Sequence, residues 1–267
     1  MKQRLASLAL LAVAASWGLT FVTMKDALNR QSVNSFLFYR FAIAAIVLLI
    51  VHPQIIRKLN WDVIKHGGIP GLFLGAGFIV QTYGLHMTTA AVTGFITGLY
   101  VVATPLFEQI FGGKRLGLMV WISIAIATTG LALLSLHGAR IGLGEFLVLL
   151  CALFYTGQII GLSKWSAGRD VWTMTFVQIL VVAIMTGIAS LIEGFQSPPD
   201  SGVWGVILFT ALVCTVTAFI VQTWSQAIIE STKAAVIMTM EVVFSAIFAV
   251  WIGGEVLSTR TLIGGLL

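Results

Sequence analysis

Nine apolar runs, each about 18–22 residues long, make up most of this chain and constrain its fold more than any other feature. A membrane-spanning helix needs roughly 20 mostly apolar residues, so every run is long enough to cross a bilayer. The runs cover residues 5–24, 34–51, 69–87, 90–111, 116–136, 143–163, 172–192, 203–223 and 234–252. Only 9% of the 267 residues are charged, against about 25% in an average soluble domain. The sequence therefore predicts an all-α polytopic membrane protein in a lipid bilayer, with no soluble catalytic domain.

A tenth apolar segment begins at Thr259 but stops at Leu267, which makes it too short to span. Two interpretations are open: this end lies in the membrane interface, or the tenth helix is truncated in this chain. We favour truncation, because the internal repeat described below calls for a tenth helix. It predicts a further stretch of about 15–20 apolar residues in the native protein.

Basic residues predict the orientation, because Lys and Arg concentrate in the cytoplasmic loops of membrane proteins. With the N-terminus inside, ten basic residues fall in inner connections and four in outer ones, and Arg40 falls within a helix. The inner ten are Lys2, Arg4, Arg57, Lys58, Lys65, Lys114, Arg115, Lys164, Arg169 and Lys233, and the outer four are Lys25, Arg30, Arg140 and Arg260. The N-terminus is therefore expected in the cytoplasm, and the net charge of +5 does not indicate a nucleic-acid partner.

The strongest pattern is an internal repeat. Residues 78–82, with the sequence Phe-Ile-Val-Gln-Thr, recur letter for letter as residues 219–223, an offset of 141. The same offset continues without gaps and superposes the Gly-Gly pair at 112–113 on the pair at 253–254. Apolar helices share letters by chance, but a gapless register that aligns two helix ends is much stronger than one shared pentamer.

Each copy of the repeat contains five helices, an odd number, so the second copy must enter the membrane from the opposite side. The predicted architecture is ten helices in two inverted five-helix repeats, residues 1–138 (helices 1–5) and 139–267 (helices 6–9 and the start of helix 10). A weaker match upstream, with an offset of 138, places Trp17 on Tyr155. Transporters are commonly built this way, because exchanging the conformations of the two halves switches access between the sides.

Glu241 is the first candidate for a binding residue, since it lies about eight residues into the ninth run, roughly 12 Å deep at 1.5 Å per residue. Ionisable groups in hydrocarbon are costly and usually face a cavity or a partner. Glu241 is therefore a substrate-amine or proton site, or else a carboxylate that bonds neighbouring helices. The repeat pairs it with Tyr100, which either offers a hydroxyl or ring to substrate or packs in the core. Arg40 either pairs with a substrate carboxylate or with Glu241, or snorkels outward.

Other polar and aromatic side chains within the runs are candidate cavity residues. Gln81 and Gln222 occupy equivalent positions and either join helices by hydrogen bonds or line a cavity. Aromatic rings away from the helix ends offer faces on which an apolar or cationic substrate stacks, or they pack in the core. These rings belong to Trp17, Tyr83, Tyr155 and Trp224. Glu108, close to Lys114 and Arg115, is expected in an interfacial ion pair.

Several motifs are absent from the sequence. There is no GxxxxGK[ST] for nucleotide hydrolysis and no HExxH, and the four histidines lie singly near the ends of runs, so no metal and no cofactor is predicted. The sequence has neither the regular Arg series of a voltage sensor nor the TVGYG filter of a potassium channel, so it does not indicate a channel. An enzyme is the least supported class, because no catalytic pair shares a predicted depth.

Five stretches carry a family resemblance in combination. They are residues 15–21 (ASWGLTF), 38–41 (FYRF), 94–100 (GFITGLY) with Pro105, 241–244 (EVVF) and 254–258 (GEVLS). With them the whole chain resembles an EamA-type member of the drug/metabolite transporter (DMT) superfamily, although Val242 stands where that family often has proline. The resemblance implies ten helices in two inverted EamA repeats, with helices five and ten peripheral. It also implies export of small metabolites such as amino acids, or of drugs, across a bacterial cell inner membrane.

The leading hypothesis is a secondary transporter that exports amino acids or related amphipathic small molecules by alternating access, with the proton as coupling ion if Glu241 carries it. One alternative is a nucleotide-sugar or phosphate-ester carrier of the same superfamily, which should place several basic residues on the cavity where this chain offers only Arg40. The other is a non-transporting membrane scaffold, in which Glu241 and Arg40 form a structural pair and no central cavity is accessible.

Overall fold

The computed structural model describes residues 2–112, 117–118, 121–122, 125–126, 129–130, 133, 136–137 and 140–266. Within these residues, eight helical segments are long and apolar enough to cross a membrane. They coincide with eight of the nine runs, which confirms the all-helical membrane fold. The ninth run, residues 116–136, falls mostly outside the described residues.

The first repeat contributes four of these spans, the last of them broken in two. Its helices are α1 (Lys2–Leu28), α2 (Val33–Val51), α3 (Ile55–Lys58), α4 (Trp61–Met87), α5 (Ala90–Thr97) and α6 (Tyr100–Gly112). The short helix α3 lies in the connection between α2 and α4, and α5 and α6 together form the broken span.

The second repeat contributes the other four spans. Its helices are α8 (Leu143–Trp165), α9 (Val171–Glu193), α10 (Ser201–Ala211), the π-helical η1 (Leu212–Thr217), α11 (Ala218–Gln226), α12 (Ser231–Met238), α13 (Met240–Trp251) and α14 (Thr259–Leu266). Helices α10, η1 and α11 are continuous and form one span, as do α12 and α13. Two short strands, β1 (Leu136–His137) and β2 (Arg140–Ile141), pair antiparallel before α8.

Both broken spans are interrupted at the same position of the repeat. Helix α5 gives way to α6 after Gly98, and α12 gives way to α13 at Thr239. The offset of 141 pairs these two residues. Each break starts a new half-helix inside a span, with its N-terminal end and partial positive charge there. Discontinuous helices of this kind form the binding sites of many secondary transporters.

Polar side chains begin several helices by accepting a hydrogen bond from the backbone N–H three residues further on. These N-caps are Asn60 for α4, Thr89 for α5, Asp170 for α9 and Asp200 for α10. Each satisfies a backbone donor that would otherwise be left unpaired in the first turn of a helix.

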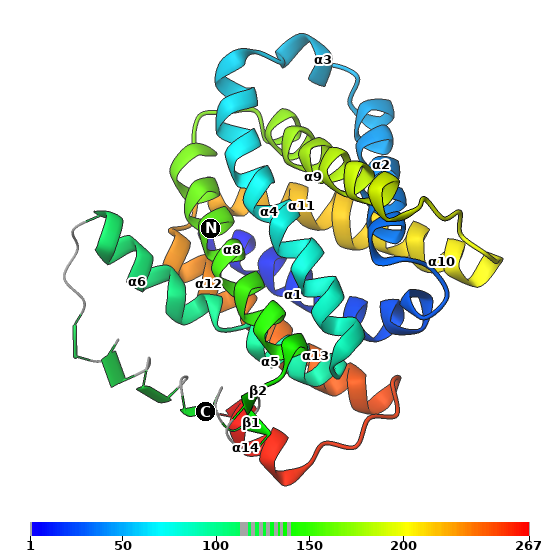
Figure 1. Ribbon diagram of the computed structural model, residues 1–267. Helices are drawn as coiled ribbons and strands as arrows, with labels where there is room; N and C mark the ends of the chain where they lie inside the picture. The colour runs from blue at the N-terminus through cyan, green and yellow to red at the C-terminus, as the bar shows by residue number, and fades with distance from the viewer. Residues whose placement is uncertain are drawn as a thin grey trace.

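The helices of the two repeats alternate in space. Helix α4 runs between α8 and α9, and α1 packs along α13 (Figure 1). Small residues on α4 make its contacts close: a Cβ atom on Gly84 would lie 2.8 Å from the carbonyl oxygen of Gly144, and one on Gly71 would lie 3.0 Å from the Cα of Gln178. Close backbone approach of this kind holds membrane helices together, and here it joins the two halves around a shared centre.

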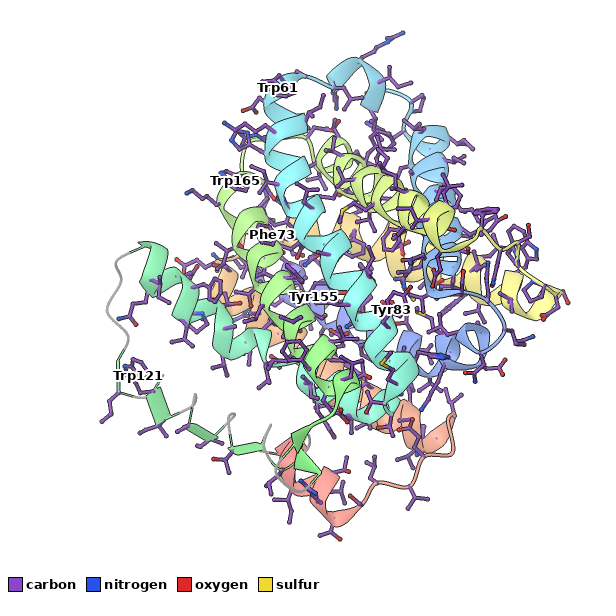
Figure 2. All side chains as sticks on the ribbon, viewed as in Figure 1. Trp61, Phe73, Tyr83, Trp121, Tyr155 and Trp165 are labelled. Atoms are coloured by element: carbon purple, nitrogen blue, oxygen red, sulfur yellow. The ribbon has the colours of Figure 1, made fainter. Side chains whose placement is uncertain are left out.

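The two ends of the bundle are distinguished by the aromatic side chains that mark them. Trp61 and Trp165 lie at one end of α4 and α8, while Tyr83 lies toward the other end of α4 (Figure 2). We call the end with Trp61 the inner end and the opposite end the outer end. Helices α1, α4, α9 and α12–α13 therefore run from inner to outer, and the other spans run back.

Candidate functional site

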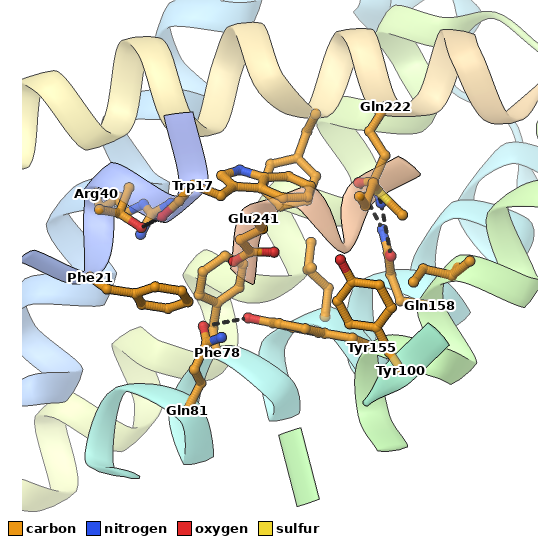
Figure 3. Close-up of a pocket in the computed structure, with 15 residues that line it drawn as sticks. Trp17, Phe21, Arg40, Phe78, Gln81, Tyr100, Tyr155, Gln158, Gln222 and Glu241 are labelled. Carbon is orange, nitrogen blue, oxygen red and sulfur yellow. Dashed lines mark hydrogen bonds between the residues drawn. The ribbon is translucent and has the colours of Figure 1, made fainter. Parts of the chain in front are cut away.

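A narrow internal cavity of about 40 Å³ lies between the two repeats (Figure 3). Its wall is built from both halves, with side chains from α1, α2, α4 and α6 facing others from α8, α11, α12 and α13. Of the nine residues predicted from the sequence, the structure brings seven together here. They are Trp17, Arg40, Gln81, Tyr100, Tyr155, Gln222 and Glu241.

The carboxylate of Glu241 lies on the cavity in the first turn of α13, directly after the break at Thr239. The residue is only 6% exposed. Among the described residues, none forms a hydrogen bond or an ion pair with this carboxylate. The helix N-terminus favours a negative charge at this place, but a buried carboxylate without a partner is costly. A ligand cation or a proton would remove that cost.

Tyr100 and Tyr155 project into the cavity from α6 and α8 (Figure 3). The hydroxyl of Tyr155 donates to Oε1 of Gln81 over 2.8 Å, and the Gln81 amide donates in turn to the Thr97 hydroxyl over 3.1 Å. The Tyr100 hydroxyl is buried, and no described residue forms a hydrogen bond with it. It therefore remains available to a molecule in the cavity, since buried polar groups are normally paired.

Arg40 lies on the cavity from α2 and is only 1% exposed. Its guanidinium lies 4.9 Å from the ring centroid of Phe78. Its Nε donates to the Thr215 hydroxyl over 2.8 Å, and an Nη lies 3.5 Å from the Cys214 carbonyl oxygen. Because these contacts hold it against η1, Arg40 neither snorkels outward nor pairs with Glu241. No carboxylate of a described residue forms an ion pair with it.

The π-helical turn η1 makes the Arg40 contact possible. A π-helix shifts the backbone hydrogen-bond register and commonly marks functional sites. The carbonyl oxygen of Cys214 in this turn also accepts a hydrogen bond from Nε1 of Trp17, over 2.9 Å. Two side chains of the first repeat, Trp17 and Arg40, are thus anchored on one turn of the second repeat.

Three glutamines form a buried amide cluster beside the cavity. The Gln158 amide donates to the side-chain oxygens of Gln178 and Gln222, each over 3.3 Å. The apolar runs surround these amides with hydrocarbon, so their hydrogen bonds join α8, α9 and α11. Gln222 and Gln158 also face the cavity, where both amides offer polar contacts.

Two predicted residues, Tyr83 and Trp224, lie outside this cavity. Tyr83 donates its hydroxyl to Glu193 over 2.8 Å near the outer end of α4. Trp224 packs against an apolar cluster that includes Tyr100 and Ile159 of the cavity wall, but it does not itself line the cavity. One geometric reason accounts for both positions: each follows a cavity glutamine, Gln81 or Gln222, by two residues, and two residues turn an α-helix by about 200°.

Sequence reasoning missed eight of the fifteen lining residues, although helical periodicity contains a signal for them: seven lie three or four residues from a predicted one, and Leu74 lies seven residues before Gln81. The two offsets, 138 upstream and 141 downstream, pair twelve of the fifteen lining residues with one another. The pairs are Trp17 and Tyr155, Thr20 and Gln158, Phe21 and Ile159, Phe78 and Phe219, Gln81 and Gln222, and Tyr100 and Glu241. The cavity therefore lies on the pseudo-twofold axis that relates the two repeats.

Comparisons with known proteins bear on the family and the fold of the chain. The model of the EamA-like transporter family matches residues 4–136 and 142–267. Two similar proteins of Archaeoglobus fulgidus are each described as an uncharacterized transporter. One is 30% identical, covering 100% of this chain and 84% of the relative. The other is 22% identical, covering 94% of this chain and 90% of the relative.

A solved crystal structure of another protein has a similar fold, with a TM-score of 0.74. The alignment covers 97% of this chain and 92% of that chain, at 16% sequence identity. At this identity the likeness concerns the fold alone.

Proposed function

Because the chain belongs to the EamA-like transporter family, within the DMT superfamily, and is a multi-pass membrane transporter rather than an enzyme, we propose that it exports amino acids or related amphipathic metabolites by alternating access. One observation carries the proposal: two opposite charges, Glu241 and Arg40, face the same cavity and do not pair with each other. A zwitterion would place its ammonium group at Glu241 and its carboxylate at Arg40. Both buried charges would then gain the partners they lack.

The rest of the cavity wall suits the remainder of such a molecule. Trp17, Phe78 and Phe219 offer aromatic surface, with the rings of Trp17 and Phe219 5.3 Å apart. The Tyr100 hydroxyl and the Gln222 amide add polar contacts. A mostly apolar pocket with a few convergent polar groups is the usual form of a small-molecule site.

A nucleotide-sugar or phosphate-ester substrate has less support. Phosphate recognition uses several cationic donors. Among the described residues that line the cavity, Arg40 is the only basic one.

We also propose that the proton is the coupling ion and that Glu241 carries it. Glu241 is the only acidic side chain among the described lining residues. Its carboxylate would bind either a proton or the substrate ammonium group, which couples their movements in opposite directions. We further propose that the protein lies in the bacterial inner membrane, with its N-terminus in the cytoplasm, the orientation that the distribution of basic residues favours.

Counterflow in proteoliposomes tests the substrate class. The panel holds amino acids, the same compounds with the carboxylate or the amine blocked, organic cations, purines and nucleotide sugars. We expect exchange of intact zwitterions and weak exchange of either blocked form. Equal exchange of blocked and intact compounds would overturn the pairing of both charges with one substrate.

Glu241→Gln tests the coupling. The amide keeps the shape of the side chain but cannot carry a proton, so accumulation driven by a pH gradient should be abolished while exchange stays measurable. An unchanged pH dependence in this variant would remove Glu241 from the coupling. Glu230→Gln is the matched control, because Glu230 is exposed at the inner end and lies away from the cavity.

A further inference from the structure

Two carboxylates connect the broken spans at opposite ends of the molecule. Near the inner end of α6, Glu108 accepts hydrogen bonds from the hydroxyls of Ser231 and Thr232, the latter over 2.8 Å. Glu108 thus contacts the first turn of α12. Its expected partners, Lys114 and Arg115, lie outside the described residues.

At the outer end, Glu255 follows α13 and reaches the first turn of α5. Its carboxylate accepts the backbone N–H groups of Ala90 and Ala91, over 2.9 and 3.3 Å. Lys25 of α1 forms an ion pair with the same carboxylate over 3.2 Å. The carboxylate therefore takes the place of the missing acceptors at a helix N-terminus, where negative charge is favoured.

The repeat shows that these two contacts are equivalent. The offset of 141 pairs Ala90 with Ser231 and Ala91 with Thr232. The two carboxylates therefore contact equivalent residues, each in the repeat to which it does not itself belong. The carboxylates themselves are not repeat partners, because position 249, the counterpart of Glu108, is an alanine. Two different positions in the sequence thus supply a carboxylate to the same two residues of the repeat, which donate side-chain hydroxyls at the inner end and backbone N–H groups at the outer end.

We propose that Glu108 and Glu255 are the inner and outer latches of the transport cycle. The two broken spans carry Tyr100 and Glu241 on the cavity just after their breaks, and the latches lie at either end of these spans. Opening the cavity to one side requires the first turn of one broken span to move away from the last turn of the other broken span on that side. The latch there must release while the opposite latch holds.

This assignment makes Glu108 and Glu255 positioning residues, since neither lines the cavity. It rests on the transporter activity and not on the substrate class or the proton coupling proposed above. A test that measures the opening of each end without substrate therefore separates this inference from the proposed function.

Paired cysteine reporters provide that test. Phe21 and Ile159 are repeat partners on the cavity, the first toward the outer end and the second toward the inner end. Phe21→Cys and Ile159→Cys are made separately in a background in which the two native cysteines, Cys151 and Cys214, are replaced by alanine. A membrane-impermeant thiol reagent is added to either face of proteoliposomes that hold the protein in a known orientation, and the labelling rate is measured.

Glu255→Gln should raise labelling of the outer reporter from the outer face by about tenfold, the factor expected when one hydrogen bond to a charged group is lost from a two-state equilibrium. Labelling of the inner reporter from the inner face should not rise. Glu108→Gln should give the reciprocal result. Size-exclusion chromatography of each variant confirms that it remains folded, and glutamine preserves the volume of the side chain.

Two matched controls neutralise a carboxylate at the same end without touching a latch. Asp26→Asn lies beside Lys25 at the outer end, where the side chain of Asp26 bonds only to Arg30 among the described residues. Glu230→Gln lies beside Ser231 at the inner end, where its side chain forms no cap. If a latch variant raises labelling at both ends, leaves both ends unchanged, or behaves like its control, the two carboxylates do not control access to the cavity and the proposal fails.

Discussion

The outer and inner ends of the two broken spans occupy equivalent positions of the repeat, yet different contacts close them. At the outer end, Gly18 and Gly94 allow α1 and α5 to approach α13 so closely that a Cβ atom on Gly18 would lie 2.7 Å from the backbone nitrogen of Ser245. At the inner end, the offsets place Thr156 and Ala235 at the same two positions. The inner helices therefore carry side chains where the outer ones carry none.

Polar contacts take the place of close packing at the inner end. Besides the Glu108 contacts, the Gln226 amide donates to the Ser163 hydroxyl and to the Ile159 carbonyl oxygen, each over 3.0 Å. Water can replace such hydrogen bonds at small net cost, whereas separating closely packed helices loses their van der Waals contacts. We therefore expect the inner end to open more easily than the outer end.

Gly18→Ala should have the largest effect on this comparison. The new methyl group would meet Ser245 N and, at 2.8 Å, the Cβ of Phe244, and neither atom can rotate away. Overpacking of this kind costs about 1–3 kcal/mol, so the thermal unfolding temperature in detergent should fall clearly. Gly205→Ala in α10 is the control, because a Cβ there meets nothing within 4 Å. Equal unfolding temperatures for the two variants would show that α1 and α13 are not closely packed at Gly18.

Ala235→Gly, at the inner counterpart of Gly94, should have a smaller effect. Ala235 is fully buried in α12. Glycine in a helix costs about 1 kcal/mol relative to alanine. The same unfolding assay checks the result. A loss of stability as large as that of Gly18→Ala would mean that the two ends are packed alike and would break the comparison.

The fold followed from the sequence because its main determinants are local or repeated. Eight of the nine apolar runs are helices of the expected position, and the family resemblance is confirmed. Run length and charge depletion suffice for this, since every spanning helix satisfies its own backbone hydrogen bonds. The breaks at Gly98 and Thr239 were not predicted, because an interruption of one or two residues leaves the hydropathy of a run unchanged.

The site was predicted in outline, and its hydrogen bonds were not. Depth in the membrane indicated Glu241, and the repeat indicated Tyr100. The π-helical turn that holds Arg40 depends on tertiary contacts with α2, so no local pattern predicts it. Helical phase could have separated Tyr83 and Trp224 from the cavity, because each lies on the opposite side of its helix from a predicted glutamine.

The smallest expected effect concerns two carboxylates at the membrane surfaces, Asp170 at the inner end and Asp200 at the outer end. At the inner end, Asp170 caps α9 and pairs with Lys58 over 2.7 Å. Burial raises the pKa of this carboxyl, but the hydrogen bonds from Lys58 and Thr173 outweigh burial and hold the pKa below its ordinary value. At the outer end, the pKa of Asp200 is lowered first by the backbone N–H of Val203 and then by Arg30.

Lys58→Met should therefore lower stability by about 0–1 kcal/mol at neutral pH, with the difference shrinking at high salt. A carboxylate with a lowered pKa stabilises the fold fully above its ordinary pKa of about 3.9, and the contribution is lost as pH falls through the folded value. Wild type and Lys58→Met should consequently converge in unfolding temperature as pH falls below the lowered folded pKa of Asp170. Arg30→Gln at the outer end should leave more of the Asp200 pKa shift in place, because the N–H of Val203 remains. Titration of each carboxyl by NMR in both variants would decide the comparison: a larger rise in pKa for Asp200 than for Asp170 would show that the outer ion pair, and not the helix cap, dominates there.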